Sequence, residues 1–130
     1  MTLNNETMEE MKDLTLNGYQ KLALETAVYP VEYKILYPSL GLNGEAGEVA
    51  DKVKKVLRDS EVILRDGSGA IVIPDEKRKE LAKEVGDVLW YVATMAYDLG
   101  YTLEEIATMN YQKLKSRQQR HQLNGSGDNR

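Results

Sequence analysis

Two pairs of acidic residues recur in this chain with the same spacing and with a glycine between the two acids. Glu45 and Glu48 form the first pair, and Glu84 and Asp87 form the second. Residues three apart are neighbours on one face of an α-helix, so each segment offers two adjacent carboxylates. Oxygen ligands of this kind suit Mg²⁺, Mn²⁺ or Ca²⁺ better than zinc or copper. One such pair is common on a solvated helix face, whereas two matched pairs favour a cation site.

The residues around the acids repeat as well. LNGEAGEVADKV, which begins at Leu42, aligns with LAKEVGDVLWYV, which begins at Leu81, so that apolar positions and acids coincide. Both segments are therefore predicted to be amphipathic helices, and burial of their apolar stripes should bring the four acids together. Two unit charges about 4 Å apart repel by roughly 4 kcal/mol at an effective dielectric constant of about 20. A cation would remove this penalty.

Other metal and phosphate sites fit the sequence less well. Di-iron bundles use a Glu-x-x-His motif from two helices, and the single histidine here is His121 in a polar tail. The sequence has neither the acidic loop of an EF-hand nor a P-loop. Because Mg²⁺ usually keeps coordination positions open for water or phosphate oxygens, four carboxylates with Mg²⁺ indicate phosphate chemistry.

The acid pairs resemble the MazG-like group of all-α nucleoside triphosphate pyrophosphohydrolases, whose mark is E-x-x-E followed after a spacer by E-x-x-D. The segments YQKLALETAVYP and YPSLGLNGEAGEVADKVKKVLRD look like family segments too, and the resemblance covers roughly residues 15–117. It implies hydrolysis of a nucleoside triphosphate to the monophosphate and pyrophosphate, with Mg²⁺ as cofactor and Mn²⁺ as a substitute. The 35 residues between Glu48 and Glu84 exceed the usual family spacer, which leaves the role of residues 58–76 open.

The resemblance and the helical spacing together predict residue roles. The expected metal ligands are Glu45, Glu48, Glu84 and Asp87, and Glu48 is also the predicted general base that takes a proton from water. Cationic and polar side chains should contact the substrate, because phosphate oxygens that the metal does not reach need other partners. The predicted substrate-binding residues are Lys52, Lys55, Asn110, Lys113, Arg117, Gln20 and Tyr37.

The first acidic segment also contains Gly41, Gly44 and Gly47. Each glycine inside a helix costs roughly 1 kcal/mol relative to alanine. Gly44 and Gly47 are expected either to let phosphate or metal approach closely or to allow tight packing against another helix. The sequence leaves both explanations open.

The elements that must position these residues follow from hydrophobic periodicity and from local helix signals. Residues 14–28 read as an amphipathic helix, residues 29–41 as an extended or turning connection, and residues 42–57 as a second helix. Short β-branched runs around residues 66–69 predict a β-hairpin. A third helix is expected from Asp75 to about Leu99, and a capping box at Thr102 and Glu105 predicts a last helix to about Gln119.

The predicted fold is therefore all-α: a bundle of about four helices with a small β-hairpin inserted between the second and third helices. We expect one MazG-like helical domain over residues 1–120 and a disordered tail over residues 121–130.

Composition narrows the class of partner. The net charge of -4 argues against nucleic-acid binding, which depends on surplus lysine and arginine. The chain has no cysteine, and its N-terminus lacks the basic and apolar parts of a signal peptide, so we expect a cytoplasmic protein without a membrane partner.

The third predicted helix is apolar on two sides, because Trp90 and Tyr97 lie opposite Val85, Val92 and Ala96. Such a helix is usually buried on both faces, which predicts a homo-oligomer, a dimer or tetramer, with Trp90 and Tyr97 at an interface. Two other functions stay open: a non-catalytic helical metal-binding or interaction module, and a phosphoribosyl-ATP pyrophosphohydrolase. The sequence does not indicate which base is preferred.

Overall fold

Four α-helices make up most of the part of the chain that the structure describes. The structure is a computed structural model, and it describes residue 11 and residues 14–59, 64–65, 67 and 71–120. The elements in chain order are α2 (Leu16–Glu25), the 3₁₀ helix η1 (Val31–Tyr33), α3 (Leu36–Arg58), β1 (Leu64–Arg65), β2 (Ile71–Val72), α4 (Asp75–Asp98) and α5 (Leu103–Gln119).

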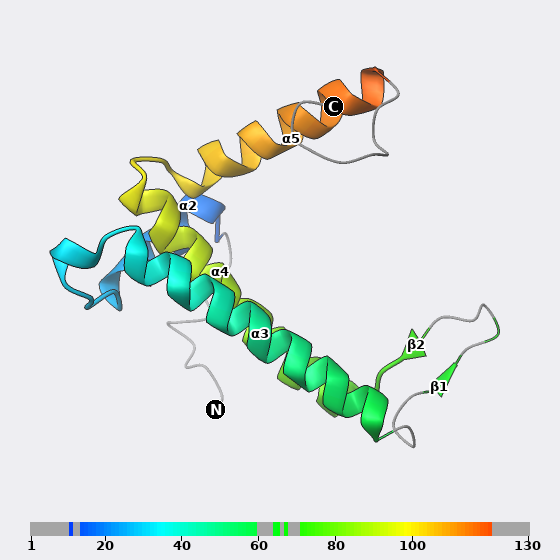
Figure 1. Cartoon of the computed structure of the whole chain (residues 1–130). Coiled ribbons are helices and arrows are strands. Elements are labelled where there is room, and N and C mark those ends of the chain that lie inside the picture. Colours follow the sequence, from blue (N-terminus) through cyan, green and yellow to red (C-terminus); the bar gives the residue numbers. More distant parts are fainter. Residues whose placement is uncertain (1–10, 12–13, 60–63, 66, 68–70, 121–130) are drawn as a thin grey trace.

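The two longest helices, α3 and α4, lie side by side in opposite directions (Figure 1). The strands β1 and β2 lie at the end where α3 finishes and α4 starts. At the other end α2 packs against α4, and α5 contacts α2 and α4 before it extends away from the α3–α4 pair (Figure 1). The antiparallel pair is thus the frame that holds both acidic segments.

The predicted β-hairpin between the second and third helices is wrong as a component of the fold. Pairing among the described residues of this segment is limited to β1 and β2, which have two residues each and place Leu64 opposite Val72. An isolated pair of strands is marginal in water unless further strands or a helix support it. The turn expected at residues 66–69 lies, apart from Gly67, outside the described residues. The fold is all-α, and its helical part agrees with the prediction.

Local signals at helix ends are confirmed. The Thr102 side chain accepts a hydrogen bond from the Glu105 backbone N–H, and the Glu105 carboxylate accepts one from the Thr102 backbone N–H, which completes the capping box of α5. Gly100 follows α4 with a φ of 84°, a conformation that glycine adopts without the steric cost of a side chain. These residues set the sharp turn between α4 and α5.

The second helix begins earlier than its hydrophobic pattern predicts. α3 starts at Leu36 and carries Pro38 in its first turn, where a backbone N–H has no partner to lose. Ile35 precedes it with a strained φ of 66°, and its N–H donates to Asp98 Oδ2 at 2.9 Å. The Tyr29 hydroxyl donates to the same oxygen, and burial first and this carboxylate second raise the pKa of Tyr29 to about 12. Asp98 therefore fixes the entry into α3.

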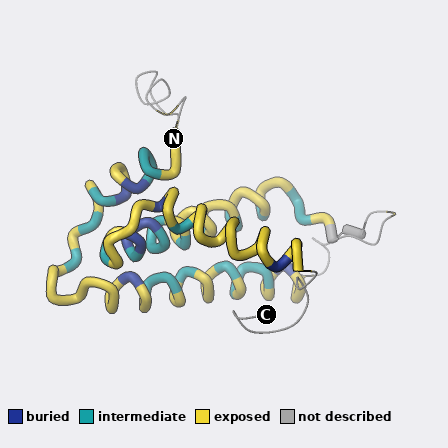
Figure 2. Tube along the Cα trace, turned by 90° about the horizontal axis from the view of Figure 1, so that it is seen from above, coloured by how far each residue is buried: buried dark blue, intermediate teal, exposed yellow. Residues whose placement is uncertain are grey.

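The main hydrophobic core lies where α2, α4 and the start of α5 meet, and its side chains are small. Ala23, Ala93, Ala96 and Leu103 form its buried centre. Figure 2 shows buried positions on α2 and α4, whereas α5 is exposed along most of its length. Small side chains allow the helices to approach closely, which keeps α4 in a fixed position. No helix in the described ranges combines the length and apolar character needed to cross a bilayer.

Candidate functional site

Three of the four predicted acids converge between α3 and α4. Glu45 on α3 and Glu84 and Asp87 on α4 each offer a carboxylate oxygen, and these oxygens all lie within 4.8 Å of one another. Their convergence follows from the packing of two helices that carry the same pattern in opposite directions. Glu48 is exposed and lies outside this group of three.

Like charges repel one another within this acid cluster (Glu45, Glu84 and Asp87). Partial burial raises the pKa of Glu45, and the charges of Asp87, Glu84 and Glu48 raise it further. Lys52 offsets part of the repulsion, because its Nζ lies 3.3 Å from Glu84 Oε1. Three hard oxygen donors at this spacing fit Mg²⁺ or Mn²⁺, which leave further coordination positions for water or phosphate.

A cavity of about 320 Å³ adjoins two of the three acids. It is lined by Thr26, Glu45, Asp87, Trp90 and Tyr91. The Trp90 indole N–H donates to Thr26 Oγ1 at 2.8 Å, and the rings of Trp90 and Tyr91 meet edge to face with centroids 4.9 Å apart. The cavity thus places carboxylates beside aromatic rings.

Aromatic contacts continue from this cavity to the segment before α3. Tyr37 lies 6.3 Å from Tyr91 between ring centroids and stacks on Tyr29 at 4.8 Å. Tyr37, one of the predicted substrate-binding residues, therefore lies beside the aromatic rings of this cavity, and its role stays a prediction. Sequence reasoning missed Thr26 and Tyr91, although Tyr91 follows Asp87 by four residues and so lies on the same helix face.

The three glycines of α3 have different surroundings. A Cβ added to Gly41 would lie 2.1 Å from a Tyr91 ring carbon, so this glycine is required for the approach of the ring. At Gly44 and Gly47 an added Cβ would meet no described atom within 4 Å. Tight packing against a helix of this chain therefore does not explain Gly44 and Gly47.

The comparisons with known proteins place the chain in a family. A sequence profile described as the MazG nucleotide pyrophosphohydrolase domain matches residues 38–121. This chain belongs to the MazG family. It is also similar to the "Gene 37 protein" of Mycobacterium phage L5, with 45% identity over 119 residues that cover 86% of this chain and 96% of that protein. That name states no activity. No solved structure matches the chain significantly.

The profile match includes both acidic segments of this MazG-family chain. Proteins of the family act on nucleotides, and the acid cluster could hold the divalent metal that such enzymes typically use. The comparison thus shows which family the chain belongs to. The arrangement of the acids follows from the packing of α3 against α4.

The predicted substrate-binding residues on α3 and α5 fall into two groups in this MazG-family chain. Lys52 and Lys55 lie on α3 beyond the acids, where Lys52 pairs with Glu84 and Lys55 with Asp51. Asn110 and Lys113 are exposed on α5, and Arg117 is buried there with 4% of its surface exposed. Within one chain, the outer half of α5 lies away from α3 and α4, the two helices that carry the acids (Figure 1).

Gln20, another of the predicted substrate-binding residues, makes hydrogen bonds that support the fold. Its amide nitrogen donates to the carbonyls of Ala93 and Tyr101, each at 3.1 Å. Its amide oxygen accepts from the Leu103 N–H at 3.2 Å. Because Gln20 is 6% exposed and links three helices, we assign it a structural role.

Trp90 and Tyr97, the residues predicted for an interface, differ in exposure. Trp90 packs against the core and is hydrogen bonded to Thr26, so its side chain already has partners in its own chain. Tyr97 is 52% exposed, and the Lys34 ammonium lies 5.8 Å from its ring centroid. Of the two, Tyr97 is the residue available to a neighbouring molecule.

Proposed function

We propose that this MazG-family chain is a Mg²⁺-dependent hydrolase that converts nucleoside triphosphates to nucleoside monophosphates and pyrophosphate, with Mn²⁺ as a substitute metal. The observation that carries the proposal is the convergence of Glu45, Glu84 and Asp87 within 4.8 Å, inside the segment that matches the family profile. The adjoining aromatic cavity supports a ligand that has both phosphates and a flat ring.

In this proposal the three clustered carboxylates hold the metal. A bound Mg²⁺ would neutralise phosphate charge and lower the pKa of a bound water. Glu45 contributes from α3, and Glu84 and Asp87 contribute from α4, so the helix pair fixes the spacing of the ligands. The raised pKa of Glu45 supports this role, because a carboxylate crowded by other acids gains most from a cation.

Glu48 is the proposed general base. It lies on α3 three residues after Glu45 and outside the cluster of three, and it is exposed, so its carboxylate is free to meet a water molecule. It would accept a proton from that water as the water oxygen bonds to phosphorus and the bridge between the α- and β-phosphorus atoms breaks. The bridging oxygen leaves on pyrophosphate.

The aromatic cavity is the proposed base site. Rings of Trp90 and Tyr91 line it, and Tyr37 extends the aromatic group. Stacking of a base on an aromatic ring contributes about 1–3 kcal/mol and tolerates different bases. Open space at Gly44 and Gly47 supports the approach of a substrate along this side of α3.

We propose that the chain forms a homo-oligomer, in which a second copy would supply the α5 side chains that one chain does not bring to its own acids. Large apolar side chains are exposed on α3 and α5, among them Leu40 at 67% and Tyr111 at 65%. A second copy that covers them could bring Asn110 and Lys113 of its α5 to the acids. Light scattering after size exclusion at micromolar concentration should give a dimer or tetramer, and a monomer would contradict this assembly.

A cytoplasmic location stays a prediction.

The decisive experiment is pyrophosphate release from a panel of canonical and modified nucleoside triphosphates. It compares Mg²⁺ with EDTA, and the wild type with Glu48→Gln. Glu25→Gln is the matched control, because Glu25 is an exposed acid at the end of α2. We expect metal-dependent release that Glu48→Gln loses by at least about a hundredfold, the lower end for general acid–base catalysis, and that Glu25→Gln retains.

Two outcomes would favour the other functions. If no nucleotide is hydrolysed although Mg²⁺ raises the melting temperature, the acid cluster belongs to a metal-binding module without turnover. If phosphoribosyl-ATP is hydrolysed and ordinary nucleoside triphosphates are not, the chain is a phosphoribosyl-ATP pyrophosphohydrolase.

A further inference from the structure

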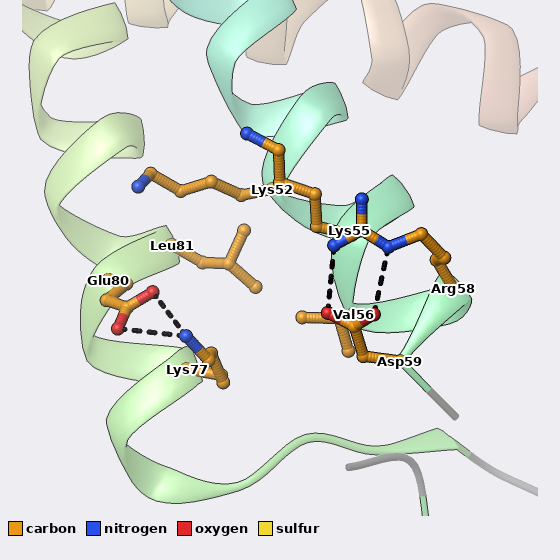
Figure 3. Close-up of a pocket in the computed structure, with 8 residues that line it drawn as sticks. All are labelled: Lys52, Lys55, Val56, Arg58, Asp59, Lys77, Glu80 and Leu81. Carbon is orange, nitrogen blue, oxygen red and sulfur yellow. Dashed lines mark hydrogen bonds and ion pairs between the residues drawn. The ribbon is translucent and has the colours of Figure 1, made fainter. Parts of the chain in front are cut away.

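A second cavity, of about 180 Å³, lies between the C-terminal end of α3 and the N-terminal end of α4 (Figure 3). We call it the basic pocket, because four of its lining residues are cations: Lys52, Lys55, Arg58 and Lys77. Its apolar lining includes Val56, which is 6% exposed. At about 30 Å³ for each water molecule in the liquid, the volume suits a small ligand rather than a macromolecule.

The basic pocket gathers four cations on a chain whose net charge is negative. The complete chain carries -4. The lining also includes two acids, Asp59 and Glu80, and two acids outside the lining, Asp51 and Glu84, pair with Lys55 and Lys52. Each of the four cations therefore has an acidic partner, and an anion that binds here exchanges for those carboxylates.

The ion pairs inside the pocket do not prevent an anion from binding. Arg58 Nε lies 2.9 Å from Asp59 Oδ1, and Lys77 Nζ lies 3.0 Å from Glu80 Oε2. The side chains of Arg58 and Asp59 are 68% and 55% exposed, and those of Lys77 and Glu80 are 43% and 45% exposed. Exposed pairs of this kind contribute little to stability, so a more highly charged ligand can exchange for the carboxylates.

Lys52 connects the basic pocket to the acid cluster. It lines the pocket and reaches from α3 towards α4 (Figure 3), where its Nζ contacts Glu84 Oε1. A metal held by Glu84 would share that carboxylate with Lys52 and weaken the ion pair, which would make the Lys52 ammonium more available to a phosphate. The pocket therefore adjoins the place where the triphosphate of the proposed reaction must lie.

We propose that the basic pocket binds the diphosphate end of the substrate and the pyrophosphate product, with Arg58 and Lys77 as binding residues. This inference rests on the proposed function. A diphosphate fits the pocket because it presents several charged oxygens in a small volume, and because guanidinium and ammonium groups are the strongest side-chain donors to phosphate.

Calorimetric titration of inorganic pyrophosphate into the full chain in EDTA tests the proposal without metal. The test protein is the double variant Arg58→Gln with Lys77→Gln. The matched control is Lys54→Gln with Lys79→Gln, which removes the same charge from exposed positions of the same two helices that do not line the pocket. We expect the pocket variant to bind pyrophosphate at least tenfold more weakly than wild type and the control to change less than twofold.

Equal weakening in both double variants would overturn the proposal, because it would show a response to net charge alone. Absence of pyrophosphate binding to the wild type would overturn it as well. Each single variant is measured too, and circular dichroism checks that every variant is helical, so a folding defect cannot imitate lost binding.

The same proteins separate this proposal from the proposed reaction. If the wild type hydrolyses no nucleotide but the binding pattern holds, the reaction fails and the pocket stands as a pyrophosphate site. If the wild type hydrolyses nucleotides but both double variants bind pyrophosphate alike, the reaction stands and the pocket assignment fails.

Discussion

Replacing Glu45 with glutamine should stabilise the metal-free chain, although Glu45 lies in the proposed active site. The substitution keeps the shape of the side chain and removes one of three clustered negative charges. At a separation of 4.8 Å, two charges repel by about 0.9 kcal/mol in bulk water and by about 3.5 kcal/mol at an effective dielectric constant of about 20. Glu45 has two such neighbours, but Asp87 is exposed and Lys52 neutralises part of the charge of Glu84. The net gain should lie near the water limit, at about 1–2 kcal/mol.

Thermal unfolding in EDTA at pH 7 measures this gain. About 1–2 kcal/mol corresponds to a rise of roughly 4–8 °C in Tm for a chain of this size. In millimolar Mg²⁺ the wild type should have the higher Tm, because it gains stability from the metal and Glu45→Gln gains little. Glu25→Gln, on exposed surface at the end of α2, should change neither value.

Thermal unfolding at acid pH checks the sign of this electrostatic effect on stability. The pKa of Glu45 is raised in the folded state, so the folded chain holds this proton more tightly than the unfolded chain does. The stability linked to that proton is fully present below the unfolded pKa and is lost as pH rises through the folded pKa. The advantage of Glu45→Gln in EDTA should therefore shrink as pH falls towards 4.5. A variant that melts at or below the wild-type temperature in EDTA at pH 7 would refute the reasoning.

Four further substitutions test particular contacts. Gln20→Ala should lower the free energy of unfolding in urea by about 3 kcal/mol, because three hydrogen bonds to backbone groups are lost at a buried site; a change below about 1 kcal/mol would show that water replaces them. Lys52→Met should raise calorimetric Mn²⁺ affinity about threefold or more, since a cation 3.3 Å from Glu84 is removed, and unchanged affinity would mean that the pair does not compete with metal. Gly41→Ala should destabilise the metal-free chain in thermal unfolding by about 2 kcal/mol, because the added methyl group clashes with Tyr91. Gly44→Ala should instead stabilise the chain by up to about 1 kcal/mol. Equal effects at the two glycines would contradict the described packing.

Features that depend on neighbours in the chain were predictable. The capping box at Thr102 and Glu105 needs only residues three apart, and a glycine that ends a helix acts within one turn. The matched acid pairs were readable for the same reason, because helical spacing places both acids of a pair on one face. Family membership also follows from this pattern, and the profile match confirms it.

Sequence patterns predicted the structure less reliably where a short element depends on contacts with the rest of the fold. The residues between α3 and α4 have β-branched character, yet only two residues on each side pair among those described. The start of α3 was missed because Asp98, 63 residues later, holds Ile35 in its strained conformation. No local pattern contains such a partner.

What the residues specify directly is the chemistry available to this protein: carboxylates in matched pairs, cations beyond them and a helical frame. How those groups are combined depends on distances between α3 and α4, which arise from packing. Packing gathers Glu45, Glu84 and Asp87 into a group that does not include Glu48. It also pairs Lys52 with Glu84 and places Gln20 in hydrogen bonds that support the fold. It also brings Arg58 and Lys77 into one pocket from the ends of two helices. Electrostatic and steric energies depend on through-space distance, and separation along the chain does not fix that distance.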